Sequence, residues 1–407
     1  KTGVGRGNRI DILSQVQFPH SVGLFYTMVT QFLGFSGYGD ESKVMGLSTF
    51  GYPEFTDRLR TIISAENGTI RLNLKYFNHE HGVGTSWADS TPDISRLYNE
   101  NLTRLMGPQR QPEEEITSRH QNIATSVQHL TEEILFSVID DMCSRYGIRN
   151  LVLTGGLAYN SLLNARISDE TPIDRIYVPP SPGNSGLCIG SALALLGDEA
   201  SRVEMDHAFW GPEYSSKQIE QVMKSRGTSY EKLADPVAKA VELLTSGKAL
   251  GWFQGRMEFG PRSLGSRCIL VNPITPDPRR IKRRHNLKPL GISILEDHAS
   301  AYIHGVQHSP FMSFMGRLRG RHRREFENVI LNNYCRYQTV GPENPLLQKV
   351  LARFKEVTGL PFLINTSLNV EGEPVTESPE VLLEHFDAMH LDAAILDDLL
   401  LQRETRA

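Results

Sequence analysis

Residues 150–156 read Asn-Leu-Val-Leu-Thr-Gly-Gly, and residues 176–186 read Ile-Tyr-Val-Pro-Pro-Ser-Pro-Gly-Asn-Ser-Gly. Each stretch is a short apolar run that ends in a glycine-containing turn, which predicts strands at 150–154 and 176–178. The alanine-rich residues 189–196 after the second turn predict a helix. Strand, glycine turn and helix in succession predict an α/β fold.

The two glycine turns are candidate ligand-binding loops. Gly155 and Gly156 directly follow a strand, and a glycine there lets backbone N–H groups approach a phosphate because no Cβ intervenes. Either turn alone could be a plain chain reversal. Two such turns in one domain make a nucleotide site about as good an explanation as plain turns, because open α/β sheets bind ligands at the carboxyl ends of their strands.

The chain outside these turns predicts two domains. The first half shows a helical apolar patch at 22–35, a polar loop or insertion at 78–111, and a helix at 113–145 that three acidic residues open and Gly147 ends. Residues 197–207 are polar and resemble a linker. The second half predicts helices at 215–226 and 236–246 and strands at 249–253 and 361–364. We therefore expect a domain boundary near residue 205.

Composition excludes several protein classes. The 407 residues are 39% hydrophobic and 22% charged, with 43 basic and 47 acidic side chains and a net charge of −4. These values exclude a disordered chain, a collagen-like chain and a highly basic nucleic-acid coat. No apolar run approaches the ~18 residues that a membrane span needs. Four scattered cysteines without a CxxC pair argue against a zinc ribbon and predict a reducing cytoplasm.

Residues 253–267 read Phe-Gln-Gly-Arg-Met-Glu-Phe-Gly-Pro-Arg-Ser-Leu-Gly-Ser-Arg and form a second candidate site, the arginine loop. Its guanidinium groups, at Arg256, Arg262 and Arg267, match the oxygens of a phosphate bidentately. A surface loop in which Glu258 neutralises one arginine is the alternative. The apolar neighbours indicate partial burial, which favours an anionic ligand, because burying an unpaired arginine is costly.

Three further segments carry polar groups. The first segment, Asn365, Thr366 and Ser367, follows a predicted strand. Its polar groups could donate hydrogen bonds to a ligand, or they could cap the N-terminus of a helix. His79 and His81 are a weak candidate metal pair. The arginine-rich run 317–324 could contact RNA or an acidic lipid surface, but such a run is more often a solvated or mobile loop, and no aromatic residues interleave it.

Six strings resemble the O-carbamoyltransferase family, which includes the nodulation carbamoyltransferases of rhizobia and enzymes that decorate antibiotics. They are Pro-His-Ser-Val-Gly at 19–23, Lys-Val-Met-Gly-Leu at 43–47, Thr-Gly-Gly at 154–156, the arginine loop, Arg-Tyr-Gln-Thr-Val at 336–340 and Asn-Thr-Ser-Leu-Asn-Val-Glu-Gly-Glu-Pro at 365–374. The resemblance runs over nearly the whole chain in the same order.

The resemblance implies an α/β fold with two domains. Residues 1–204 resemble an N-terminally incomplete domain of the ASKHA (actin-like) type, and residues 205–407 resemble a YrdC-like α/β domain. In the family the second domain joins carbamoyl phosphate and ATP into carbamoyl adenylate. The first domain then transfers the carbamoyl group to a hydroxyl at a site that a divalent metal (Fe or Mg/Mn) assists.

The motifs and the resemblance together assign the site. Catalytic roles fall to Lys43 and Asn184, and no residue is assigned as a metal ligand. Binding of ATP and carbamoyl phosphate falls to Gly155, Gly156, Asn160, Gly183, Arg256, Arg262, Arg267, Lys288, Arg336, Asn365, Thr366 and Ser367.

The chain departs from the family pattern at several positions. The opening segment with its paired histidines is missing, and Asn184 replaces the usual aspartate, although a neutral amide is the poorer ligand for a cation. Lys288 replaces an arginine, and 330–334 lack the usual histidine-containing string. Because of these departures we expect a need for an upstream segment or partner chain. The resemblance itself implies a hydroxyl-bearing acceptor, such as a sugar or lipo-chitooligosaccharide. The alternatives are a diverged nucleotide-binding subunit and a tRNA-modifying relative, which the net charge disfavours.

Overall fold

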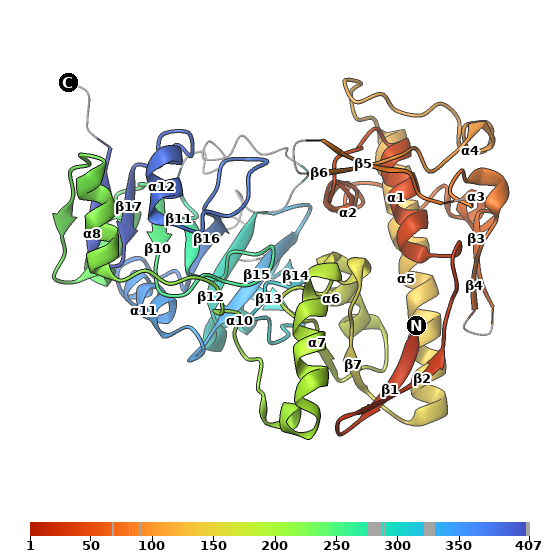
Figure 1. The fold of residues 1–407 in the computed structure, drawn as a ribbon. Coiled ribbons are helices and arrows are strands. Elements are labelled where there is room, and N and C mark those ends of the chain that lie inside the picture. The colour runs from red at the N-terminus through yellow and green to blue at the C-terminus, as the bar shows by residue number, and fades with distance from the viewer. Residues whose placement is uncertain are drawn as a thin grey trace. The chain divides into compact units, whose positions relative to one another are not determined.

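The computed structural model describes residues 1–66, 69–80, 82–88, 91–275, 287, 290–320 and 330–403. The fold is mixed α/β, as the sequence predicts (Figure 1). By the contacts between its residues, the chain divides into two compact units. The first unit comprises Lys1–Val152, Leu162–Tyr177 and Gly190–Val203, and the second comprises Leu153–Ser161, Val178–Ile189 and Glu204–Ala407.

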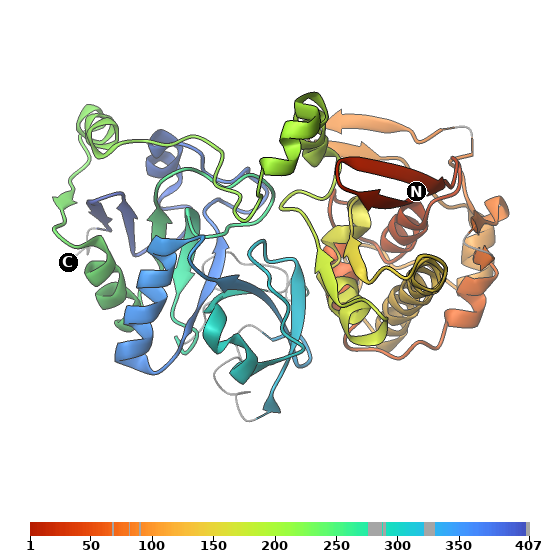
Figure 2. The same cartoon turned by 90° about the horizontal axis from the view of Figure 1, so that it is seen from below.

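The first unit is built around one long helix, α5 (Ser118–Tyr146), against which α1, α2 and α3 pack (Figure 2). Its other helices are α1 (Val22–Phe32), α2 (Glu41–Leu47), α3 (Thr56–Arg60), α4 (Glu100–Met106) and α6 (Ser161–Glu170). Its strands form four pairs: β1 (Thr2–Arg6) with β2 (Arg9–Ser14), β3 (Ile63–Glu66) with β4 (Thr69–Leu72), β5 (Thr85–Ala88) with β6 (Thr91–Ile94), and β7 (Asn150–Val152) with β8 (Arg175–Tyr177). Only the last pair is parallel.

Helix α5 begins five residues later than the acidic opening predicts. Thr117 is its N-cap, and the Thr117 backbone N–H donates to Nδ1 of His120 at 3.1 Å. The acidic residues 113–115 lie before this cap, because a threonine that fixes the first turn outweighs their attraction to the helix dipole. Gly147 ends the helix in the left-handed conformation at φ 63°, as predicted.

The second unit contains a ten-stranded mixed sheet in the order β13-β14-β15-β12-β16-β11-β10-β17-β18-β9. The strands are β9 (Glu231–Lys232), β10 (Leu250–Phe253), β11 (Arg267–Val271), β12 (Gly291–Leu295), β13 (Ile303–His304), β14 (Phe314–Leu318), β15 (Tyr334–Val340), β16 (Phe362–Ser367), β17 (Ala393–Leu396) and β18 (Leu399–Gln402). The helices are α8 (Ser216–Ser225), α9 (Pro236–Thr245), α10 (Glu296–Tyr302), α11 (Pro345–Thr358) and α12 (Pro379–His385). Helix α7 (Leu187–Leu196) joins the two units in the chain.

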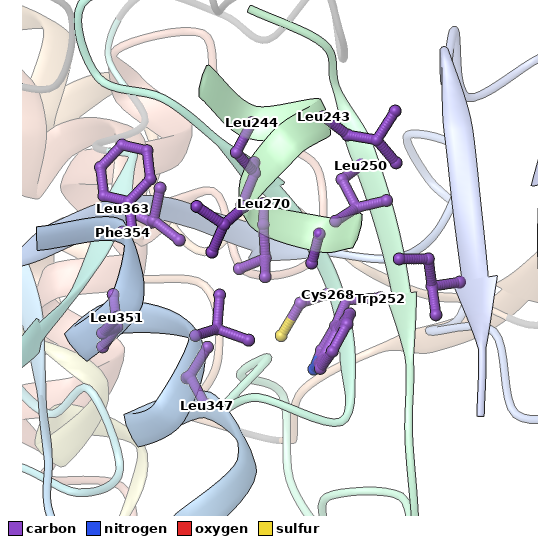
Figure 3. Close-up of a cluster of buried hydrophobic side chains, with 14 of the residues drawn as sticks. Leu243, Leu244, Leu250, Trp252, Cys268, Leu270, Leu347, Leu351, Phe354 and Leu363 are labelled. Carbon is purple, nitrogen blue, oxygen red and sulfur yellow. The ribbon is translucent and has the colours of Figure 1, made fainter. Parts of the chain in front are cut away.

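Helices α9 and α11 cover one face of this sheet and bury its core. Figure 3 shows Leu243 and Leu244 of α9, Leu347 and Phe354 of α11, and Trp252 of β10 gathered in this cluster. Both helices start with a proline after a side-chain cap: Asp235 accepts from the Ala238 N–H, and Asn344 accepts from the Leu347 N–H. The core therefore fixes the sheet whose end carries the candidate site.

Most predicted elements exist, with two exceptions. The predicted loop at 78–111 is wrong in part, because it contains the hairpin β5–β6 and helix α4. The predicted linker at 197–207 includes a 3₁₀ helix at Gly197–Arg202. The boundary at 204/205 stays a prediction. All four cysteines are free thiols. Within the described ranges, no helix has the length and apolarity to cross a bilayer.

Candidate functional site

The predicted binding residues of the second unit gather at one end of its sheet. Phe253, the last residue of β10, pairs with Arg267, the first of β11. Cys268 pairs with Ser367 at the end of β16, and Gly291, which opens β12, pairs with both Asn365 and Arg336. Strand register therefore brings together residues that lie up to 100 positions apart in the sequence.

The arginine loop covers this end of the sheet and folds around a buried carboxylate. Glu258 is 4% exposed. Its Oε1 accepts four backbone N–H groups, from Leu264 at 2.7 Å, Gly265 at 2.9 Å, Ser266 at 2.7 Å and Arg267 at 3.1 Å. Consecutive N–H groups that converge on one point form a concave anion site. The protein's own carboxylate fills this one.

Arg267 is held inside the protein rather than presented to solvent. Its side chain is completely buried, and its guanidinium carbon lies 3.6 Å from the centre of the Phe253 ring. Its terminal nitrogens donate to four backbone carbonyl oxygens, those of Gln254 (2.9 Å), Ser266 (3.1 Å), Pro212 (3.2 Å) and Gly255 (3.1 Å). Burial lowers the pKa of Arg267 to about 10, and the charge of Glu258 partly opposes that shift. Its surroundings differ from those of a phosphate-binding arginine, and a ligand contact at Arg267 stays a prediction.

The other two arginines of the loop are more accessible. Arg256 is exposed and donates one hydrogen bond, to the Trp210 carbonyl at 2.9 Å. Arg262 is half-buried and directly precedes the segment that Glu258 holds. A guanidinium that keeps free N–H donors at a solvent boundary can bind a phosphate bidentately. Arg256 therefore fits the predicted role better than Arg267 does.

A buried polar network lies between the arginine loop and the sheet. The Nδ2 of Asn365 donates to the Ser263 carbonyl at 3.2 Å and to Ser293 Oγ at 2.8 Å, and Ser293 in turn bonds Gln338 Oε1 at 2.7 Å. Asn365 is 1% exposed, and its Oδ1 has no hydrogen-bond partner. The network thus orients the amide and leaves its acceptor oxygen for another donor.

Strand alternation separates the three residues at 365–367. Asn365 and Ser367 share one face of β16, and Thr366 lies on the other. The Thr366 hydroxyl is buried without a hydrogen-bond partner, whereas Ser367 Oγ bonds the Asn369 side chain at 2.7 Å. Arg336 is 5% exposed and donates from Nε to Ser161 Oγ at 3.3 Å. Arg336 and Asn365 therefore lie on either side of Gly291 on one face of the sheet, while Thr366 lies on the other face.

The two glycine turns bond to each other within the second unit. Gly155, at φ 93°, donates its N–H to the Pro182 carbonyl at 2.7 Å. Gly260 of the arginine loop, at φ 114°, lies so close to the second turn that a Cβ there would stand 2.6 Å from the Pro180 carbonyl oxygen. Glycine is required at 260 for both reasons. The turns and the arginine loop thus form one packed group.

Exposure divides the predicted residues of these turns. Gly155, Gly156 and Asn184 are exposed, Gly183 is half-buried, and Asn160 is buried. Asn184 opens a short 3₁₀ helix, Asn184–Gly186, at the tip of the second turn. The Gly155 N–H already donates to the Pro182 carbonyl. A phosphate at this position would compete with that carbonyl for the same N–H group.

Two predicted residues, Lys43 and Lys288, remain to be placed. Lys43 belongs to the first unit, where its Nζ forms an ion pair with Asp40 at 2.8 Å. Lys288 lies outside the described residues, as does His81. His79 is buried, and its Nε2 is 2.8 Å from the Pro19 carbonyl oxygen.

One open pocket of about 360 Å³ lies at the carboxyl ends of β10 and β17. Gly255 of the arginine loop contributes to it, together with Tyr214, Glu213 and Asp397. Two carboxylates in a pocket repel an anionic ligand. None of the predicted binding residues lines it, so this pocket does not suit the phosphates.

Sequence reasoning missed the residues that hold the site together. Gln338, Ser293 and Asn344 carry no chemical signature in the sequence. Because Glu258 lies among three arginines in the sequence, an ion pair with one of them was expected. In the structure its carboxylate instead accepts hydrogen bonds from backbone N–H groups. The glycine and serine at 265–266, which allow a tight turn, are the one signal that could have indicated this arrangement.

Comparisons with known proteins cover both halves of the chain. The family model "Carbamoyltransferase N-terminus" matches residues 3–193, and "Carbamoyltransferase C-terminus" matches residues 241–403. An uncharacterized protein of Synechocystis sp. is 30% identical over 98% of this chain and 70% of its own length. Nodulation protein NolO of Bradyrhizobium diazoefficiens is 30% identical over 98% of this chain and 72% of its own length. Nodulation protein NolNO of Sinorhizobium fredii is 29% identical over 99% of this chain, which spans 58% of that relative.

Proposed function

Because the chain belongs to the carbamoyltransferase family, we propose that it transfers a carbamoyl group from carbamoyl phosphate to a hydroxyl group. ATP is the second substrate, and carbamoyl adenylate is the activated form. The acceptor we propose is a sugar-containing molecule such as a lipo-chitooligosaccharide. We base this class of acceptor on the resemblance to the O-carbamoyltransferase family, and two similar proteins are named nodulation proteins.

The two halves divide this work in our proposal. Residues 1–204 form a transfer domain of the ASKHA type, and residues 205–407 form a YrdC-like domain that makes the adenylate. The family models at 3–193 and 241–403 fall on either side of that boundary, which supports the division.

The single observation that carries the proposal is the polar end of the ten-stranded sheet. Arg336 and Asn365 both pair with Gly291 there, one on each side of β12, in the unit whose loop carries Arg256 and Arg262. Guanidinium groups bind phosphate oxygens through paired N–H donors. A carbamoyl group adds N–H donors of its own, and the buried Oδ1 of Asn365 is an acceptor without a partner. The residues therefore fit both ends of carbamoyl phosphate.

The proposed reaction balances in three steps. Carbamoyl phosphate gives carbamate and phosphate by addition of water. The carbamate oxygen attacks the α-phosphorus of ATP and expels pyrophosphate. The acceptor oxygen then attacks the carbamoyl carbon, AMP leaves with the electron pair of the broken C–O bond, and the hydroxyl proton passes to solvent or a base. Positive charge at Arg256, Arg262 and Arg336 stabilises the phosphates through these steps. For Lys43 and Asn184 we propose contacts with the reacting group during transfer.

A divalent metal does not fit the residues that the structure describes. Across those ranges, no three His, Cys, Asp or Glu side chains come together as metal ligands would. Asn184 offers one amide oxygen, which binds a cation more weakly than a carboxylate does. No step above is therefore assigned to a metal.

We further propose that the first domain binds another polypeptide segment, from an upstream region or a partner chain. Helix α7 supports this, because its only polar side chain is Ser191 and none of its ten residues is buried. Leu187 is 68% exposed and Leu195 is 90% exposed. The parallel pair β7–β8 supports it as well, because parallel sheets normally have both faces covered, and Val152 of β7 is 66% exposed.

The test of the proposed function is carbamoyl-phosphate-dependent exchange of labelled pyrophosphate into ATP. Wild type should catalyse the exchange, and Arg336→Met should reduce kcat/KM by about 10²-fold or more, as expected when a charged contact to a phosphate is lost. Arg353→Met is the matched control, since Arg353 lies on α11 in an exposed ion pair with Asp235. A wild-type protein without exchange activity, or equal losses in both variants, would refute the proposal.

A further inference from the structure

Glu258 holds four consecutive peptide groups of the arginine loop from one side. Its Oε1 accepts the N–H groups of Leu264 and Gly265, and Arg267 reaches both Oε1 and Oε2 at 3.1 Å. A carboxylate with this many donors is fixed in place, because each hydrogen bond to a charged group is stronger than a neutral one. Its burial also excludes competing water.

The same peptide groups are held from the other side by side chains of the sheet and α11. The Leu264 carbonyl accepts from Gln338 Nε2 and from Asn344 Nδ2, both at 2.7 Å. The preceding carbonyl, of Ser263, accepts from Asn365 Nδ2 at 3.2 Å. An amide plane that donates to Glu258 must aim its carbonyl the opposite way. The carboxylate thus determines where these two carbonyl oxygens point.

The Ser263 carbonyl helps to orient the Asn365 amide, together with Ser293 Oγ, which also accepts from Nδ2. Asn365 Nδ2 faces this carbonyl, so Oδ1 faces away from the loop and has no partner of its own. If the loop turned, Nδ2 would keep only its contacts on the sheet side, such as that to Ser293 Oγ, and Oδ1 would be held less firmly in its present direction. Arg262 would move too, because it directly precedes Ser263.

We propose that Glu258 is a positioning residue for the carbamoyl donor, which acts through the segment 263–267 on Asn365 and Arg262. This inference rests on the function proposed above. Glu258 fills the backbone anion site permanently, so the substrate phosphate does not bind there. Its contribution to the reaction is the orientation of one acceptor oxygen and one guanidinium toward carbamoyl phosphate.

The first test compares Glu258→Gln with wild type and with the control Glu356→Gln, an exposed carboxyl on α11. Glu258→Gln keeps the side-chain volume but brings an NH₂ group against the backbone N–H cluster. Native-state hydrogen exchange of amides 264–267 should become at least about tenfold faster, while the rest of the sheet keeps its protection. The KM for carbamoyl phosphate should rise about tenfold, with a smaller change in the KM for ATP. Glu356→Gln should match wild type in both measurements.

A second variant separates positioning from folding. Glu258→Ala leaves four backbone N–H donors facing a space that formate can enter. Added formate should restore the low KM for carbamoyl phosphate in Glu258→Ala and leave wild type unchanged. A role in stability alone would appear as a lower unfolding midpoint with an unchanged KM in the folded variants, and it would overturn the proposal. Unchanged amide exchange in Glu258→Gln would overturn it as well.

Failure of the proposed function would be distinguishable from failure of this inference. If wild type shows no pyrophosphate exchange, the binding of carbamoyl phosphate by calorimetry replaces KM as the readout. Weaker binding to Glu258→Gln than to Glu356→Gln supports the positioning role. Equal binding to wild type and both variants refutes it.

Discussion

Replacing Arg267 by methionine should unfold the second unit more easily and leave its ligand contacts largely intact. The guanidinium is completely buried and donates to the carbonyls of Gln254, Ser266, Pro212 and Gly255. Methionine occupies a similar volume against the Phe253 ring but has no donor. The variant therefore removes hydrogen bonds without opening a large cavity.

The magnitude follows from two opposing effects. Each carbonyl oxygen left buried without a donor costs about 1–3 kcal/mol, and such costs are not additive among neighbours. Against this, the lowering of the pKa of Arg267 from 12.5 to about 10 reflects a burial cost of roughly 3 kcal/mol, which the variant no longer bears. The carbonyls of Ser266 and Pro212 keep backbone N–H donors, from Gln254 and Met257, so two carbonyls lose their donor and the net destabilisation should be about 2 kcal/mol.

The assay is urea unfolding followed by tryptophan fluorescence, because Trp252 lies completely buried beside this loop. Arg256→Met is the matched control. It loses one exposed hydrogen bond to Trp210 and should change the free energy of unfolding by less than about 1 kcal/mol. Calorimetry should show the reverse order, with weaker ATP or carbamoyl phosphate binding in Arg256→Met. If Arg267→Met unfolds like wild type and loses ligand binding instead, the structural interpretation of Arg267 is refuted.

Three further outcomes are expected. Arg262→Ala should weaken ATP or carbamoyl phosphate binding about tenfold or more in calorimetry, the equivalent of roughly 1.5–3 kcal/mol for a charged contact, and unchanged affinity would make the side chain structural. Burial raises the pKa of Glu132 from 4.5 to about 7 against the opposing charge of Arg166, so the stabilisation it provides is full below pH 4.5 and is lost as the pH rises to 7. Over that window wild type should lose up to about 1.4 kcal/mol per pH unit relative to Glu132→Gln in urea unfolding, and parallel pH profiles would contradict this. Replacing Leu187 and Leu195 by Gln should lower the fluorescence of the dye ANS bound to the protein, and an equal signal would place the exposed apolar surface elsewhere.

The sequence predicted the local elements better than their assembly. The strands at 150–154, 176–178 and 249–253 and the helices at 215–226 and 236–246 all exist within two residues of their expected bounds. Short apolar runs and helical periodicity are local signals, so a single sequence carries them. The sequence did not predict strands β12 and β15, which pair with each other in the sheet. Their pairing depends on contacts between distant residues, which no local pattern encodes.

The candidate site shows the same limit at the level of side chains. Residue type marked Arg256, Arg262 and Arg267 as one group, because all three carry the same charge. Burial then distinguishes them, since Arg267 is completely enclosed and Arg256 is exposed. The difference arises because Arg267 is the first residue of strand β11, all of whose residues are buried in the sheet. Charge can be predicted from sequence, but its availability to a ligand depends on the fold.

The internal anion explains why one loop can contain both kinds of arginine. Consecutive backbone N–H groups and a buried guanidinium would each attract a phosphate if they were free. Glu258 occupies the first, and four carbonyl oxygens occupy the second. Both sets of groups therefore have internal partners, and these bonds hold the loop together. Arg256 is exposed and Arg262 is half-buried, so both are more accessible than Arg267. A ligand that binds them meets donors already fixed in place, so less of its binding free energy is lost in ordering the loop.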